Sequence, residues 1–254
     1  MLTVSLVQTD IIWEDISKNL KLYQKKINNI KSDIIIFPEM FSTGFTMNPE
    51  NVSEEMDGFT INWMKKNSSK LNSAICGSLV IKENNNYYNR FVWVNPNGDI
   101  YHYDKKHLFS FAGENNKFTS GDSKLIIEYK GWKIKPLICY DLRFPVWSRN
   151  IEDFDVLLYV ANWPSKRKTH WKSLLVARAI ENQSYVIGVN RVGTDGNDHV
   201  YSGETTLINA MGETLYINSH IEEVWTTAIH KLDLDKVRKQ LPFLTDRDNF
   251  QIIQ

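Results

Sequence analysis

The chain has 254 residues, 42% hydrophobic and 24% charged, which is typical of a globular protein with one large domain or two small ones. Lys plus Arg and Asp plus Glu number 30 each, so the formal net charge is zero. A neutral chain lacks the positive field that nucleic acids or anionic membranes attract, and its longest apolar runs are too short to span a bilayer. We therefore expect neither a nucleic-acid nor a membrane partner. With only two cysteines and no signal-peptide pattern at the start, we expect a cytoplasmic protein.

Strand and helix patterns alternate along the first half of the chain. Residues 2–8 alternate polar and apolar side chains as a strand does, and apolar side chains at steps of three and four predict a helix over 15–31. The β-branched run at 33–39 indicates a strand that is buried on both faces. The remaining elements in this half are a helix near 59–72, a strand at 74–81, and a hairpin of 87–94 and 99–104 around the turn sequence NPNG.

The same alternation continues through the second half, with more hairpins. We predict strands at 124–129 and 133–140, a short helix after Cys139, a strand at 155–162, a helix over 168–183, a strand at 185–192, a hairpin around 209–213, a strand at 224–229 and a helix near 233–239. No linker, repeat or low-complexity segment interrupts the pattern. The sequence thus predicts one α/β domain over residues 1–254, with a mixed sheet or two sheets covered by helices.

Reactive side chains stand where several of these strands end. Glu39 follows IIIFP, Lys105 follows YHYD, Cys139 follows KIKPLI and Asn162 follows LLYVA. In α/β proteins, reactive groups collect beyond the carboxyl ends of strands. Each residue alone has an ordinary explanation: a free cysteine is usually buried in the core, and Glu39 or Lys105 alone is usually solvated surface.

Together, three of these residues make chemical sense as a site. A nearby ammonium lowers the pKa of a thiol, and a carboxylate can accept its proton. Attack of the sulfur on an amide carbonyl creates an oxyanion, which Lys105 and the backbone N–H of Tyr140 could stabilise. We therefore interpret Cys139 as a nucleophile rather than a core residue.

Three segments carry a family resemblance that covers almost the whole chain. FPEMFSTGF (37–45), YDKKHLF (103–109) and ICYDLRFP (138–145) resemble the glutamate, lysine and cysteine segments of the nitrilase superfamily of carbon–nitrogen hydrolases. The resemblance implies Glu39, Lys105 and Cys139 as the catalytic residues, with Glu114 of FAGEN as a second glutamate that orients the lysine or a water. It also implies a four-layer α-β-β-α sandwich that pairs into a homodimer or a larger homo-oligomer.

Two further segments narrow the resemblance to one branch of the superfamily. ANWP (161–164) and LPFLTDR (241–247) are most similar to the bacterial omega-amidase branch, which hydrolyses the terminal amide of short 2-oxo acids such as 2-oxoglutaramate and 2-oxosuccinamate. We expect no metal and no cofactor, because the chain has no HExxH, paired CxxC, EF-hand, GxGxxG or Walker motif.

Substrate contacts are less defined by the sequence. A 2-oxo acid carries a carboxylate, for which Arg167, Lys166 and Arg143 are candidate partners. We favour a structural ion pair with Asp141 for Arg143, and we expect Phe41 and Trp163 to wall the pocket, ahead of Phe45 and Trp147. Of the other candidate nucleophiles and bases, Cys76 is expected to be core, His107 to bond backbone, and His170 to pack or cap a helix.

Three other functions remain open at this point. The first is a hydrolase of the same superfamily that acts on an N-carbamoyl amine or another small amide. The second is a papain-like enzyme that pairs Cys139 with a histidine and has no use for Lys105. The third is a binding protein on the same scaffold, whose usual mark is the loss of one of the three reactive residues.

Overall fold

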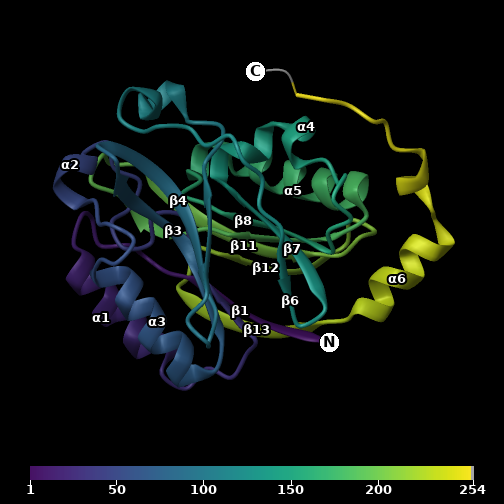
Figure 1. Ribbon diagram of the computed structural model, residues 1–254, viewed down its shortest axis with the longest axis horizontal. Coiled ribbons are helices and arrows are strands. Elements are labelled where there is room, and N and C mark those ends of the chain that lie inside the picture. The colour runs from purple at the N-terminus through teal and green to yellow at the C-terminus, as the bar shows by residue number, and fades with distance from the viewer. Residues whose placement is uncertain (253–254) are drawn as a thin grey trace.

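The computed structural model describes residues 1–252 and contains two β-sheets packed face to face, with helices on their outer faces (Figure 1). The first sheet has the strand order β13-β1-β2-β3-β4-β5. Its strands β1, β2 and β3 are parallel to one another, and the flanking pairs are antiparallel. The strands are β1 (Leu2–Gln8), β2 (Ile34–Ile36), β3 (Ala74–Glu83), β4 (Asn86–Val94), β5 (Ile100–Asp104) and β13 (Glu223–Ile229).

The second sheet has the order β10-β11-β9-β8-β7-β6, with β12 paired to β11. Its central strands β7, β8 and β9 are parallel, and the continuous buried runs of β8 and β9 are typical of strands covered on both faces. The strands are β6 (Ile127–Tyr129), β7 (Trp132–Ile138), β8 (Val156–Val160), β9 (Tyr185–Val189), β10 (Val192–Thr194), β11 (Val200–Ile208) and β12 (Thr214–Ser219).

Alternate residues of the first sheet face two different cores. Val4 and Cys76 belong to the cluster between the sheets, whereas Ile35 and Ile75 pack against the outer helices. The outer cluster takes Tyr23 and its neighbours from α1 (Ile16–Ile27) and apolar residues from α3 (Phe59–Leu71). On the far side, α5 (Lys168–Asn182) covers the second sheet. The order helix, sheet, sheet, helix confirms the α-β-β-α sandwich (Figure 1).

The predicted elements are present, but the first helix and several strands are shorter than predicted. The strands predicted at 124–129, 133–140, 155–162 and 185–192 span Ile127–Tyr129, Trp132–Ile138, Val156–Val160 and Tyr185–Val189. The helix predicted over 15–31 is α1; it begins after Asp15, whose carboxylate accepts from Lys18 N, and ends at Ile27, before two asparagines that are poor helix formers. The strand predicted over 33–39 pairs only over Ile34–Ile36, since Pro38 has no N–H to donate. The remaining helices are α2 (Pro49–Val52), α4 (Pro145–Ser148) and α6 (Lys231–Gln240).

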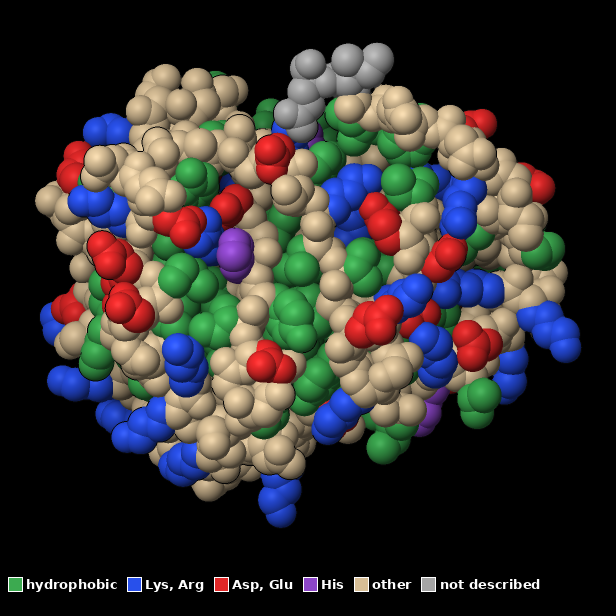
Figure 2. Space-filling model, in the orientation of Figure 1, with side chains coloured by type: hydrophobic (Ala, Val, Ile, Leu, Met, Phe, Trp, Pro, Cys, Tyr) green, Lys and Arg blue, Asp and Glu red, His purple; other side chains and the backbone are tan. Residues whose placement is uncertain are grey.

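The surface agrees with the balanced composition. On the face shown in Figure 2, acidic and basic side chains are interspersed and hydrophobic side chains lie mainly near the centre. No helix within residues 1–252 is both long and apolar enough to cross a lipid bilayer.

Candidate active site

Four strand ends meet at one edge of the sandwich and bring the predicted residues together. Glu39 follows β2, Lys105 follows β5, Cys139 follows β7 and Asn162 follows β8. Parallel strands within each sheet place their carboxyl ends at the same edge, which is why residues far apart in the chain converge here. Glu39, Lys105 and Glu114 are almost completely buried, and Cys139 is partly exposed to the cavity described below.

Lys105 forms the centre of a buried ion cluster. Its Nζ lies 2.9 Å from Glu39 Oε1, and 3.1 and 2.9 Å from the two carboxylate oxygens of Glu114. The loop 105–118 folds back so that the N–H of Phe109 donates to Glu114 Oε2 at 2.6 Å. The backbone N–H of Asn162 donates to Glu39 Oε2 at 2.8 Å. Every oxygen of the two carboxylates therefore has a donor, so both side chains are held in single orientations.

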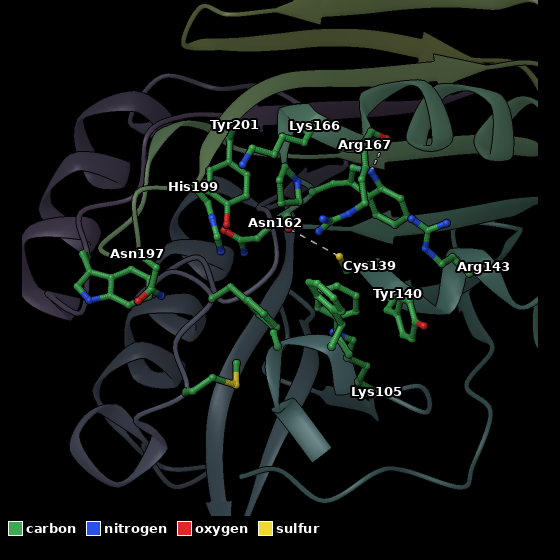
Figure 3. A pocket seen from close by; sticks show the side chains of 18 of the residues that line it. Lys105, Cys139, Tyr140, Arg143, Asn162, Lys166, Arg167, Asn197, His199 and Tyr201 are labelled. Carbon is green, nitrogen blue, oxygen red and sulfur yellow. Dashed lines mark hydrogen bonds between the residues drawn. The ribbon is translucent and has the colours of Figure 1, made fainter. Parts of the chain in front are cut away.

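Cys139 occupies a strained turn at the end of β7. Its backbone φ is +43°, in the left-handed region that a residue with a Cβ rarely adopts. The turn continues as a 3₁₀ segment, Cys139–Arg143, and the thiol Sγ lies 3.9 Å from the carbonyl oxygen of Asn162 (Figure 3). A sharp strand-to-turn junction of this kind exposes the sulfur beyond the sheet and leaves the next N–H, that of Tyr140, available as a donor.

Burial and the neighbouring charges shift the pKa values of Lys105, Glu114 and Cys139. Burial disfavours the ammonium of Lys105, but the carboxylates of Glu114 and Glu39 outweigh burial and hold its pKa above the usual value. Burial also raises the pKa of Glu114, while the charge of Lys105 opposes that increase. For Cys139, burial and then the negative charge of Glu39 raise the thiol pKa, against the effect of Lys105. The resting sulfur is therefore a protonated thiol at neutral pH, and it needs a base to become a nucleophile.

A cavity of about 680 Å³ opens over Cys139 and Lys105. Trp163 and Arg167 line it, as the sequence analysis expected. Figure 3 shows Arg143 and Tyr140 on one side of the cysteine and His199 and Asn197 on the other. The rest of the wall is largely aromatic, with contributions from Trp13, Phe45, Phe109, Phe111 and Tyr201.

The prediction that Phe41 walls the pocket is wrong. Phe41 is fully buried in the cluster beneath the outer helices, where its ring stacks on Phe37 with 4.8 Å between centroids and meets Tyr23 edge-on. A Cβ on Gly77 would come within 2.7 Å of the Phe41 ring, so this ring lies directly on β3. The turn after Glu39 rotates the side chain of residue 41 away from the cavity, and Phe45 lines the wall instead.

This placement predicts how Phe41→Ala behaves. The truncation leaves a cavity in a dry core, so the free energy of unfolding should fall by about 3–5 kcal/mol. Because the ring lies outside the pocket, KM for an amide substrate should stay within about twofold in protein that remains folded. Chemical denaturation and steady-state kinetics on the same sample measure both quantities. A large rise in KM with unchanged stability would contradict the placement.

The interpretation of Arg143 as a structural partner of Asp141 is also wrong. Asp141 is buried and accepts from the ring and N–H of His107, from Tyr103 Oη and from the N–H of Ile138. Both carboxylate oxygens of Asp141 already accept hydrogen bonds from these groups, and Arg143 instead lines the cavity. The Arg143 guanidinium lies 4.8 Å above the Trp163 ring centroid, with Nη2 3.1 Å from His170 Nδ1.

The structure also places the two histidines, Trp147 and Cys76 for which the sequence analysis gave expectations. His170 lies on the exposed face of α5 and contacts Arg143, rather than packing or capping a helix. His107 bonds the Asp141 side chain as well as contributing a backbone donor, and its ring stacks on Phe144. Trp147 is buried and donates to Tyr103 outside the pocket, and Cys76 is core as expected.

Asn89 is the residue that sequence reasoning missed. It lies fully buried in the middle of β4, where its side-chain amide reaches the ion cluster. The signal in the sequence is an amide side chain within a strand, YYNRFVWV, whose other residues apart from Arg90 are apolar or aromatic. A buried polar group in that position needs polar partners, although the pattern alone does not say which.

No metal centre accompanies this cluster. Across residues 1–252, no group of three or more His, Cys, Asp or Glu side chains is arranged to hold a metal ion.

Comparison with known proteins agrees with this geometry. The model of the carbon-nitrogen hydrolase family matches residues 3–240, so the chain belongs to that family and is an amide-hydrolysing enzyme.

Particular relatives narrow the comparison. The chain is 41% identical over 253 residues to the omega-amidase YafV of Escherichia coli K12, covering 99% of this chain and 98% of the relative. It is 32% identical to the 2-oxoglutaramate amidase of Bacillus subtilis, with 96% of each covered. The crystal structure of a CN-hydrolase superfamily protein from Xanthomonas campestris, which carries an arsenic adduct in its active site, superposes with a TM-score of 0.97 at 40% identity, over 99% of this chain and 98% of the other.

Proposed function

We propose that this enzyme hydrolyses the terminal amide of short 2-oxo dicarboxylic acid monoamides, such as 2-oxoglutaramate and 2-oxosuccinamate, to the acid and ammonia. One observation carries the proposal: a partly exposed thiol beside a buried carboxylate–ammonium cluster, in a cavity that also holds unpaired cations. Two relatives that match nearly the whole chain, the omega-amidase YafV and the 2-oxoglutaramate amidase, support the substrate class.

The first half of the reaction forms a thioester. Glu39 accepts the proton of the Cys139 thiol as the sulfur attacks the amide carbon. The carbonyl oxygen becomes an oxyanion, stabilised by the ammonium of Lys105 and the N–H of Tyr140. Glu39 then returns the proton to the nitrogen, the C–N bond breaks and ammonia leaves.

The second half releases the acid. A water enters, Glu39 takes one of its protons, and the resulting hydroxide attacks the thioester carbon. The C–S bond breaks, and the sulfur recovers the proton from Glu39. Throughout, Glu114 holds Lys105 in place through the two oxygen contacts at 2.9 and 3.1 Å. Because Glu39 and Glu114 both remain close to Lys105, its ammonium stays charged at each step.

Besides Lys105, three cationic side chains line the cavity near the thiol: Arg143, Lys166 and Arg167. None of them forms an ion pair with a carboxylate within residues 1–252; Arg143 lies over Trp163, and Arg167 lies 5.3 Å from the Phe109 ring centroid. A cation without a protein counter-ion in a largely aromatic cavity favours a ligand with its own negative charge. The carboxylate of a 2-oxo acid supplies that charge, whereas an N-carbamoyl amine does not.

A panel of amides tests the substrate class. With ammonia release as the readout, kcat/KM for 2-oxoglutaramate should exceed that for an N-carbamoyl amine by about 100-fold or more, since the site recognises a charged group that the latter lacks. 4-Oxopentanamide, in which a methyl group replaces the carboxylate and the keto group is kept, is the control for the carboxylate. Turnover of the carbamoyl amine with 2-oxoglutaramate untouched would overturn the proposal.

We also propose that residues 1–254 form one domain, that it assembles into a homodimer or a larger homo-oligomer, and that it works in the cytoplasm. The resemblance to the family supports the assembly, and the two free thiols, Cys76 and Cys139, suit a reducing compartment. Light scattering on the purified protein measures the subunit number.

A further inference from the structure

Asn89 links the two carboxylates of the ion cluster. Its Nδ2 donates to Glu39 Oε1 at 2.8 Å and to Glu114 Oε1 at 3.1 Å. Its Oδ1 accepts from Ser78 Oγ at 2.8 Å, and the Ser78 hydroxyl in turn accepts from the N–H of Met40, the residue after Glu39. The side-chain NH2 group of Asn89 therefore donates one hydrogen bond to each acid, and the hydrogen bond that Ser78 donates to Oδ1 fixes the orientation of the amide.

The charge balance of the cluster explains why a neutral donor is needed. Two carboxylates share one ammonium, that of Lys105, in a buried site where like charges repel strongly. A second cation would neutralise the pair but would compete with Lys105 for the carboxylate oxygens. A neutral amide supplies two hydrogen bonds without a further charge, so the acids stay close together and both remain oriented on Lys105.

The contacts also divide the work between the two oxygens of Glu39. Oε1 accepts from Lys105 and Asn89, whereas within residues 1–252 Oε2 has one hydrogen-bond donor, the N–H of Asn162. The carbonyl of that same residue, Asn162, is the group that lies 3.9 Å from Cys139 Sγ. The less occupied oxygen of Glu39 therefore lies beside the residue that contacts the thiol.

We propose that Asn89 is a positioning residue of this active site: its amide holds Glu39 Oε1 and Glu114 Oε1 around Lys105, so that Glu39 Oε2 is left to exchange the proton with Cys139. The inference rests on the proposed roles of Glu39, Lys105 and Cys139, and it adds a residue outside that group. Asn89 is not among the residues that line the cavity, and its side chain bonds Glu39, Glu114 and Ser78, so it acts through Glu39.

Three variants test this role. Asn89→Ala removes both donors, Asn89→Ser keeps one shorter donor, and Asn89→Asp keeps the shape but places a third carboxylate against the other two. Asn150→Asp is the matched control. Asn150 is also a buried asparagine whose side-chain amide donates two hydrogen bonds, to the carbonyls of Phe154 and Asn182, and it lies away from the cavity. The melting temperature of each variant separates folding from activity.

For Asn89→Ala we expect kcat to fall about 100-fold while KM stays within about threefold, since misplacing a catalytic base by 1 Å has an effect of that size. Asn89→Ser should recover part of kcat. For Asn89→Asp, the acid limb of the kcat/KM profile should move to higher pH. The groups that face the new charge are Glu39, Glu114, Lys105 and Cys139, with Tyr201 near Glu39. A third carboxylate adds like charge to the cluster and so favours uptake of a proton by it.

Alkylation of Cys139 by iodoacetamide at pH 7 gives a readout that needs no substrate. It should slow in Asn89→Ala and stay unchanged in Asn150→Asp. The inference is wrong if Asn89→Ala and Asn89→Asp both fold but keep the wild-type kcat, pH profile and alkylation rate. If Asn89→Asp does not fold, the kcat and alkylation rate of Asn89→Ala and Asn89→Ser decide the question instead. Should the wild type ignore every 2-oxo amide, the proposed substrate class fails, and the alkylation comparison still decides the role of Asn89.

Discussion

Replacing Cys139 with alanine is expected to reduce amide hydrolysis by about four orders of magnitude or more, the scale on which enzymes lose activity without their nucleophile. In the proposed mechanism the sulfur is the atom that forms the covalent intermediate, and the other thiol, that of Cys76, does not line the cavity. The side chain is partly exposed in a turn, so its truncation should change the melting temperature little. Ammonia release from 2-oxoglutaramate, followed for long times at high enzyme concentration, measures the residual rate.

Cys76→Ala is the matched control for this experiment. Cys76 lies in β3 and is fully buried between the sheets, where burial raises the pKa of its thiol. Its truncation should lower stability by about 1–2 kcal/mol through a small cavity and leave kcat unchanged. Mass spectrometry after brief exposure to iodoacetamide should find label on residue 139 and none on residue 76. Full activity in Cys139→Ala would exclude Cys139 as the nucleophile and with it the thioester mechanism.

Lys105→Met is expected to have the second largest effect, a fall in kcat of about 10²–10³-fold or more. The substitution keeps the volume of the side chain but removes an oxyanion donor worth about 2.7–4 kcal/mol. It also leaves Glu39 and Glu114 facing each other without a counter-ion, so one of them takes up a proton at neutral pH. Loss of one partner from a buried ion pair should lower the free energy of unfolding by about 3–5 kcal/mol.

Lys135 provides the control for Lys105. It is the chain's other fully buried lysine with a carboxylate partner, 3.0 Å from Glu152, and burial lowers its pKa to about 8. It lies in β7 outside the cavity wall, so Lys135→Met should leave kcat unchanged. If Lys105→Met also retains its kcat, the Lys105 ammonium is not the oxyanion donor, and the cysteine–histidine alternative, which has no use for Lys105, gains support. His107 and His199 are then the histidines to replace.

The individual elements of the fold follow from local patterns in the sequence. The apolar stripe of α1, the continuous β-branched run of β2 and the NPNG turn between β4 and β5 each identify an element within a few residues of its observed bounds. Glu39, Lys105 and Cys139 stand out in the sequence because each is the polar residue that follows a predicted strand. The resemblance of three segments to a known family then implies a role for each of them. That reasoning works because strand ends in α/β proteins share one edge of a sheet.

The errors arise where a side chain's direction depends on a turn. Phe41 and Phe45 lie in the same segment after β2, yet only Phe45 reaches the cavity, because the turn after Glu39 directs Phe41 into the helix-covered core. Arg143 and Asp141 are neighbours in sequence, but the loop at 105–109 takes up the acid and leaves the guanidinium for the cavity. Neither outcome has a local signature.

By itself, the sequence determined the alternation of strands and helices and the chemical identity of the reactive groups. Periodicity is set by short-range sterics and backbone hydrogen bonding, so it can be read within a window of a few residues. Only the tertiary structure decided which groups surround those reactive side chains: that Asn89 bridges Glu39 and Glu114, and that Asn162, 123 positions from Glu39, donates to it. Such contacts depend on how two twisted sheets pack against each other, and no short stretch of the chain encodes that packing.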